Sequence, residues 1–280
     1  MKNLILILTL TFLSFCSYAN CTGRVRIFDI ADPVDGSHWP LLTKEYTPPK
    51  AASPVIFILP PIVGETQLDR HFAARFCSAG MTVYILHVMR PENSQRELTD
   101  FSIHDDAFLR AHGAVRNVIF ELELERRFLP RYGILGMSLG GVFAAYVAGV
   151  EPKILASAII AGAGNTAGLL AYSDQKIVAQ LRQRRMRALN IPNLRTYESQ
   201  LRAALTIDPL DVVARIEPRS MYLFIPRSDR TVPVRYQREL RNAVREPLVY
   251  VMRGTHRVGL VKATRLHGGK IRSFFANRLL

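Results

Sequence analysis

Apolar residues are grouped along the chain in short runs, and the segments between these runs have helical periodicity. The runs have the length of strands and contain few polar residues; they cover 55–59, 81–88, 132–135, 154–161, 221–225 and 248–252. Such runs are typical of strands that are buried on both faces of a parallel sheet, because helices cover each face.

The intervening segments predict helices over 66–79, 105–124 and 234–244, with a further helix at the end of the chain. Thr66 and Asp69 have the spacing of a capping box, which marks the start of a helix. In 105–124 apolar residues recur three or four positions apart, as they do on the buried face of a helix. Strands that alternate with helices in this way predict an α/β fold with a doubly wound, mostly parallel sheet.

Residues 166–205 interrupt this alternation, since they have a helical and basic character with apolar residues only at intervals. We expect this segment to be a helical lid inserted into the domain. Its apolar residues could line an acyl pocket or pack the lid onto the body of the domain, and packing is the favoured interpretation. These residues are Leu169, Leu170, Ile177, Val178, Leu181, Leu189, Ile191 and Leu194.

Residues 1–19 have the three parts of a secretory signal peptide. Lys2 supplies a positive charge, residues 4–15 are almost wholly apolar, and small residues precede a cleavage site after Ala19. The apolar part is short for spanning a bilayer, although a retained membrane anchor stays an alternative. We expect an exported protein, periplasmic or secreted, whose mature domain covers residues 20–280.

Basic residues exceed acidic ones, 37 to 23, so the formal net charge is +14 and falls to +13 when Lys2 is removed. Such a charge favours anionic surroundings, for example acidic lipid headgroups or an envelope polymer. A local cluster carries no interleaved aromatic residues and no nucleic-acid motif, so we expect no specific nucleic-acid binding. We interpret this cluster as a solvated helix face; it comprises Arg182, Arg184, Arg185 and Arg187.

Two cysteines, Cys21 and Cys77, remain after the expected cleavage, and an exported chain can oxidise them. At about 100° per residue, Cys77 lies opposite Leu68 and away from the apolar face of its helix. An outward thiol is a better disulfide partner than a core residue, so we predict a bond between Cys21 and Cys77. A lipid-attached form is not favoured, because Asn20 before Cys21 is not small.

Residues 136–141 read Gly-Met-Ser-Leu-Gly-Gly and lie between an apolar run and a stretch of small residues. This is a Gly-x-Ser-x-Gly pattern in a strand-turn-helix context, the arrangement of a nucleophile elbow. The serine, Ser138, would sit on a sharp turn. Side chains at Gly136 and Gly140 would collide with the adjoining strand and helix.

A serine hydroxyl needs a base within hydrogen-bond reach, and the base needs an acid that orients it. Loops that follow the strands of a doubly wound sheet converge at one edge. Asp229 follows the run 221–225, and His256 follows the run 248–252. The chain order is therefore Ser, Asp, His.

The elbow, an aspartate three residues before a Val-Pro pair, and a Gly-x-His after the last strand together resemble the α/β-hydrolase superfamily. The resemblance covers about residues 50–280. It implies that Ser138 is the nucleophile, His256 the general base and then acid, and Asp229 the carboxylate that orients it. Asp174 is the reserve acid, since some relatives place this residue after an earlier strand.

An oxyanion hole requires backbone N–H groups aimed at the developing negative charge. Leu139, the residue after the nucleophile, should supply one of them, and the loop after 55–59 should supply the other. Family members often carry His-Gly in that loop, whereas this chain has Pro60 and Pro61. Proline has no N–H, so Ile62 is the expected second donor.

The resemblance implies a serine hydrolase that forms an acyl-enzyme without a metal or organic cofactor. We interpret the protein as a carboxylesterase or lipase-like enzyme acting on a small-molecule or lipid acyl ester. A peptidase, thioesterase or acyltransferase stays open because one triad serves all of them, as does a non-catalytic binder of anionic surfaces. The other histidines have no metal-site spacing and are interpreted as structural; they are His38, His71, His87, His104, His112 and His267.

Overall fold

The computed structural model describes residues 21–49, 53–90, 94–125 and 128–280. The expected signal peptide, residues 1–19, lies outside these ranges. No helix within them is both long enough and apolar enough to cross a membrane.

A single eight-stranded sheet forms the centre of the described chain, with the strand order β1-β2-β4-β3-β5-β6-β7-β8. All pairings from β4 to β8 are parallel, and β1 and β2 join this sheet antiparallel at one edge. The predicted α/β fold with a mostly parallel sheet is therefore confirmed. The strands are β1 (Arg24–Ala31), β2 (His38–Tyr46), β3 (Val55–Leu59), β4 (Thr82–Leu86), β5 (Tyr132–Met137), β6 (Ile154–Ile160), β7 (Met221–Pro226) and β8 (Leu248–Met252).

The β1–β2 hairpin has no counterpart among the predicted elements. Its outer strand alternates, with Phe28 and Ile30 buried against the domain while Val25 and Ile27 are exposed. An alternating pattern belongs to a sheet with one solvated face, and it lacks the continuous apolar signal of the central strands.

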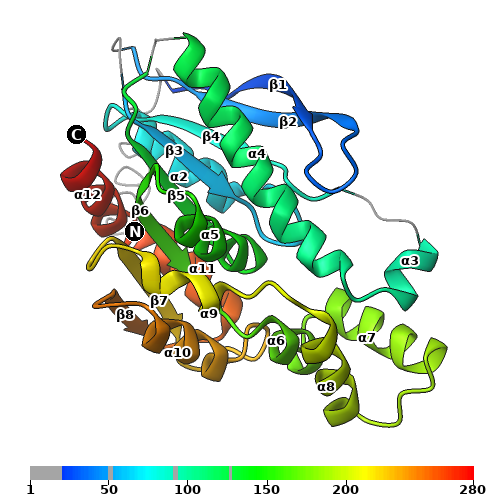
Figure 1. Ribbon diagram of the computed structural model, residues 1–280. Helices are drawn as coiled ribbons and strands as arrows, with labels where there is room; N and C mark the ends of the chain where they lie inside the picture. Colours follow the sequence, from blue (N-terminus) through cyan, green and yellow to red (C-terminus); the bar gives the residue numbers. More distant parts are fainter. Residues whose placement is uncertain (1–20, 50–52, 91–93, 126–127) are drawn as a thin grey trace, which may run out of the picture.

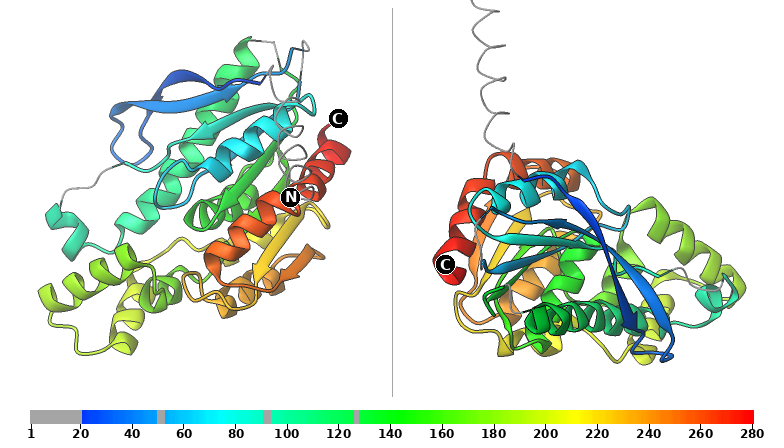
Figure 2. Two further views of the ribbon diagram at one scale, coloured as in Figure 1. Left: turned by 180° about the vertical axis from the view of Figure 1, so that it is seen from behind. Right: turned by 90° about the horizontal axis from the view of Figure 1, so that it is seen from above.

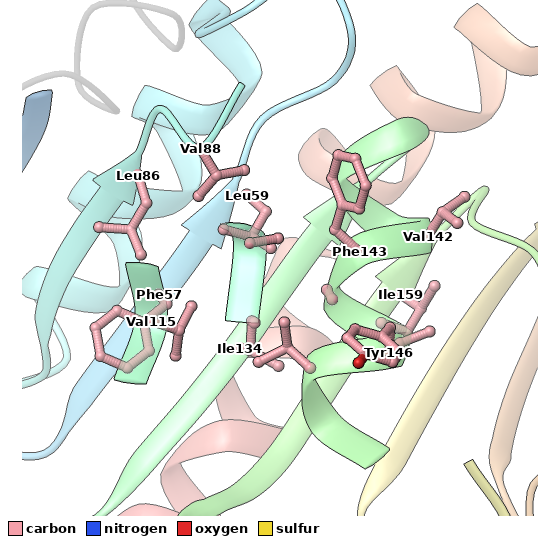
Figure 3. Packing of buried hydrophobic residues seen from close by; sticks show 14 of the residues in the cluster. Phe57, Leu59, Leu86, Val88, Val115, Ile134, Val142, Phe143, Tyr146 and Ile159 are labelled. Carbon is pink, nitrogen blue, oxygen red and sulfur yellow. The ribbon is translucent and has the colours of Figure 1, made fainter. Parts of the chain in front are cut away.

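Helices cover both faces of the sheet (Figures 1 and 2). One face packs against α4 (Ile103–Glu125), α5 (Leu139–Val150) and α10 (Val234–Ala243), and Figure 3 shows Leu59, Ile134 and Ile159 of the strands beside Phe143 and Tyr146 of α5. The other face packs against α2 (Gln67–Cys77), α11 (His256–Arg265) and α12 (Gly268–Leu279). A short α9 (Pro209–Val212) and the 3-10 turn η2 (Val213–Arg215) precede β7.

The segment between β6 and β7 folds into three helices, α6 (Thr166–Tyr172), α7 (Lys176–Ala188) and α8 (Leu194–Ala204). Together with α3 (Ser94–Thr99) they gather at one end of the molecule (Figure 1). A small core of their own holds them together, with Phe101, Tyr197 and Leu201 among its buried residues.

The helix α2 begins with the predicted capping box, in which Thr66 and Asp69 each bind the other's backbone N–H. A disulfide joins Cys77 at its end to Cys21, with the two Cα atoms 6.0 Å apart. The expected outward position of Cys77 is wrong, because this residue is only 1% exposed. Cys21 is buried in the same apolar cluster as Phe76 and Cys77, so the disulfide itself covers Cys77.

The interpretation of the arginine cluster as a solvated helix face is also wrong for part of it. Arg185 is 0% exposed, and Arg182 donates to the carbonyl oxygens of Leu170 and Ser173. Arg182 thus faces α6, whereas Arg185 faces α3 and α4, where the carbonyl oxygens of Glu97 and Asp100 accept its N–H groups. Arg184 and Arg187 are exposed, as expected.

Candidate active site

The predicted elbow is a tight turn between β5 and α5. The backbone of Ser138 has φ 57° and ψ −122°, a conformation that residues other than glycine rarely adopt. A Cβ atom at Gly136 would lie 2.1 Å from the carbonyl oxygen of Gly140, and one at Gly140 would lie 2.0 Å from that of Leu59. Only hydrogen fits at both positions, as the spacing of the motif predicts.

Ser138, His256 and Asp229 are brought together by three loops at the carboxyl ends of β5, β8 and β7. The Nδ1–H of His256 donates to Oδ2 of Asp229 at 2.8 Å, and the hydroxyl of Ser138 donates to Nε2 of His256 at 3.0 Å. The carboxylate can only accept, so it fixes the imidazole tautomer and leaves Nε2 free to accept the serine proton. This is the geometry of an activated nucleophile.

The carboxylate of Asp229 is held from three directions and is 3% exposed. The backbone N–H of Val232 donates to Oδ1 at 2.9 Å, while the side chain of Gln237 donates to Oδ2 at 3.0 Å. The same Gln237 amide donates to the carbonyl oxygen of Val232 at 2.7 Å. These bonds orient the carboxylate toward His256.

The reserve acid, Asp174, is not part of this arrangement. It is exposed, and its carboxylate accepts the hydroxyl proton of Thr231 at 2.8 Å. Its place in the segment before α7 puts it beside the Asp229 loop, where it supports the turn.

The two expected oxyanion donors border one cavity of about 430 Å³. Leu139 begins α5, where the first N–H groups of a helix have no partner within the helix, and Ile62 follows the proline pair after β3. The close approach of Gly140 to Leu59 brings these two segments together. Neither N–H has an acceptor among the described residues, so both can bind a ligand oxygen.

The cavity extends from the elbow helix to the insertion, and its walls are mostly apolar. Phe108 of α4 and Phe143 of α5, whose ring centroids lie 5.3 Å apart, border it beside the elbow. The expectation that the apolar residues of the insertion mainly pack is confirmed for four of the eight, since Leu169 packs in the main core and Leu170, Leu189 and Ile191 pack in the small one. It is wrong for Ile177, Val178 and Leu181, which only line the cavity. Leu169 and Leu170 also line the cavity, and Leu194 is exposed.

Solved structures share this architecture. An acylaminoacyl peptidase from Pyrococcus horikoshii has 16% sequence identity and a TM-score of 0.65; the match covers 97% of this chain and 43% of that one. Est1E from Butyrivibrio proteoclasticus has 14% identity and a TM-score of 0.65, and a dienelactone hydrolase from Anabaena variabilis has 13% identity and 0.60. Both of these matches cover 92% of this chain and 99% of the other.

The chain has the α/β-hydrolase fold. The predicted resemblance is thereby confirmed at the level of architecture. The chain spans less than half of the length of the peptidase that it matches. No protein-family model and no curated protein matches the sequence.

Within the described part of this α/β-hydrolase fold, no group of three or more His, Cys, Asp or Glu side chains could hold a metal ion. Most of the remaining histidines contact a neighbouring side chain: His38 contacts Asp29, His71 contacts Arg75, His87 contacts Glu65, His112 contacts Glu151, and His267 packs against Tyr250 with its ring tilted. His104 differs from these, because its ring borders the cavity.

Two residues of the site, Gln237 and His104, were not found by sequence reasoning. Gln237 lies on the buried face of α10, eight positions after Asp229, and a lone buried amide has no motif. His104 belongs to the first turn of α4 and was interpreted only as structural. In both cases the role depends on contacts that distant segments make.

Proposed function

We propose that the protein is a serine hydrolase that cleaves an ester-type acyl bond through an acyl-enzyme, with Ser138, His256 and Asp229 as its triad. The observation that carries this proposal is the hydrogen-bond chain from Asp229 through His256 to Ser138, with distances of 2.8 and 3.0 Å. The chain ends beside a mostly apolar cavity, which suits an apolar acyl group better than a peptide with many polar groups.

In the proposed reaction, Nε2 of His256 takes the hydroxyl proton as Oγ of Ser138 attacks the acyl carbonyl carbon. The N–H groups of Leu139 and Ile62 bind the oxygen that becomes negative. His256 then returns the proton to the leaving oxygen, the ester bond breaks, and the acyl group stays on Ser138. A water molecule that gives a proton to His256 attacks the acyl carbon. His256 then returns this proton to Oγ of Ser138 as the acyl–Oγ bond breaks, which releases the carboxylic acid and restores the free serine.

The names of the similar structures support the same class, since they include esterases, a dienelactone hydrolase and a peptidase. These proteins share the fold with this chain, and one fold can host many activities. The choice of an ester rests on the apolar cavity. The insertion α6–α8 covers that cavity and is proposed to act as its lid.

We further propose that the protein is exported by its leader, residues 1–19, and works in an oxidising compartment. The disulfide between Cys21 and Cys77 supports this location, because structural disulfides persist outside the reducing cytosol. Mass spectrometry of the protein from its native host would contradict the proposal if Met1 and two free thiols were found.

The activity is tested by replacing the nucleophile. Ser138→Ala is expected to abolish hydrolysis of short p-nitrophenyl esters and labelling by a fluorophosphonate probe. The matched control is Ser78→Ala, which changes an exposed serine at the end of α2 and should keep both. An unchanged rate in Ser138→Ala, with circular dichroism showing an intact fold, would remove this serine from the mechanism.

A further inference from the structure

One wall of the cavity carries a histidine among apolar side chains. His104 lies in the first turn of α4 and borders the cavity together with Ile103, Ala107 and Phe108. It comes one helical turn, about 6 Å, before Phe108, which packs against Phe143 of the elbow helix at 5.3 Å. His104 is therefore one turn farther along α4 from this contact.

A buried cation fixes the protonation of this imidazole. Arg185 is 0% exposed and donates to Nε2 of His104 at 2.8 Å, to the carbonyl oxygen of Glu97 at 2.7 Å, and to that of Asp100 at 3.4 Å. A guanidinium can only donate, so Nε2 must be the accepting nitrogen. The proton of the neutral ring is then on Nδ1.

The ring stays neutral at every ordinary working pH. Burial is the main reason that the pKa of His104 is lowered to about 3. The positive charge of Arg185 contributes to this decrease, and the negative charge of Asp100 acts in the opposite direction. Glu97, Arg90 and Arg110 also border the cavity. The charges of these three side chains are compensated by ion pairs. Arg184 lies near Glu97, while Arg90 and Arg110 both contact Asp32.

The Nδ1–H is an unused donor. No described residue accepts it, and it is not among the fully buried atoms without a partner, so it reaches accessible space beside the cavity. Val178 and Leu181 of α7 also line the cavity and present apolar side chains to it. A ligand oxygen placed here would gain a hydrogen bond, because the charged side chains that also border the cavity are already held in ion pairs.

We propose that the cavity selects acyl groups that carry an oxygen acceptor, such as an oxo, ether or hydroxyl oxygen, partway along an otherwise apolar chain. The Nδ1–H of His104 donates to that oxygen, and Arg185 holds the ring in the donating tautomer. His104 is thus a specificity-determining residue at a distance from the bond that is cleaved. This inference rests on the proposed ester hydrolysis at Ser138.

The test compares p-nitrophenyl heptanoate with its mono-oxo derivatives, one for each inner chain position. The wild-type protein should hydrolyse the best oxo derivative with a kcat/KM about 3- to 10-fold above that of the unsubstituted ester, the effect of one hydrogen bond. The preference should be the same at pH 6 and pH 8, because the pKa of His104 lies far below both.

In His104→Phe the ratio of kcat/KM for the best oxo derivative to kcat/KM for the unsubstituted ester should fall to about 1, because the donor is lost. His104→Gln should retain part of the preference, since its amide can accept from Arg185 and donate to the ligand. His104→Phe removes an acceptor of Arg185 and could therefore prevent folding. His104→Gln keeps an acceptor, so it tests the proposal even in that case. A preference that is absent in the wild type, or unchanged in a folded His104→Phe, would overturn the proposal.

A binding measurement separates this inference from the proposed activity. In the Ser138→Ala protein, ¹⁵N NMR of the His104 ring should show Nδ1 protonated, and a free oxoheptanoate should shift its signal more than heptanoate does. If the NMR signal shifts as expected but the wild-type protein hydrolyses no ester, the proposed activity is refuted and the proposed binding site is supported. Equal shifts with an active wild type would refute the site alone.

Discussion

Close packing at Gly140 predicts that an alanine at this position destabilises the protein and lowers its activity. In Gly140→Ala the new Cβ would lie 2.0 Å from the carbonyl oxygen of Leu59 and 2.4 Å from that of Pro60. Both neighbours are backbone atoms, so relief requires the start of α5 and the loop after β3 to move apart by about 1 Å. Overpacking of this kind costs about 1–3 kcal/mol, and two backbone contacts place it near the upper value.

The expected loss of about 3 kcal/mol corresponds to a fall in Tm of about 6–12 °C for a domain of this size. The displacement also carries Ile62 away from Leu139, so the two proposed oxyanion donors no longer converge. Loss of one such donor lowers kcat by about 10²–10³. Thermal unfolding followed by circular dichroism measures the first effect, and p-nitrophenyl ester hydrolysis measures the second.

The matched control is Gly269→Ala in α12, where the nearest atom to a new Cβ is a side-chain nitrogen of Arg75 at 3.8 Å. Alanine is the better helix former by up to about 1 kcal/mol, so this variant should be as stable as the wild type or slightly more so. If Gly140→Ala keeps the wild-type Tm to within about 2 °C, the reasoning from close packing is refuted. Normal kcat in a destabilised Gly140→Ala would refute only the proposed role of Ile62.

Three further predictions concern the acid of the site and the disulfide. Asp229→Asn should lower kcat by about 10³–10⁴ through the wrong imidazole tautomer of His256, measured by steady-state kinetics; a smaller change than tenfold would contradict the assigned acid. Gln237→Leu removes a donor to the carboxylate, a bond worth about 1.5–3 kcal/mol, so urea unfolding should show that loss and kcat should fall less than in Asp229→Asn. Cys21→Ser opens a loop with a sequence separation of 56 and should cost about 4 kcal/mol by loop entropy; an unchanged urea midpoint under oxidising conditions would show that the bond with Cys77 contributes nothing.

The central strands could be predicted because their burial on both faces leaves a continuous apolar run, as in β3 and β4. The elbow could be predicted because Gly136 and Gly140 follow from steric contact within a few residues. Asp229 and His256 could be placed because each directly follows a strand. In these cases the information is local.

The features that could not be predicted depend on segments distant in the sequence. A helical projection assigns Cys77 to the outer side of α2, but the disulfide with Cys21 covers this residue. The basic sequence around Arg185 predicts a solvated position, yet this side chain is buried and donates to the carbonyl oxygens of Glu97 and Asp100. The tautomer of His104, on which its proposed role as a donor to the ligand depends, follows only from the contact with the buried Arg185.

The contacts of Arg185 also limit the motion of the insertion relative to the rest of the domain. This guanidinium ties α7 to α3 and α4 through three hydrogen bonds, at distances of 2.7, 2.8 and 3.4 Å. Each such bond of a charged donor is worth about 1.5–3 kcal/mol, so a form with α7 swung away would be rarer than about one molecule in a thousand. Because α7 carries Ile177, Val178 and Leu181 of the cavity lining, these contacts keep that wall of the cavity in one place in nearly every molecule.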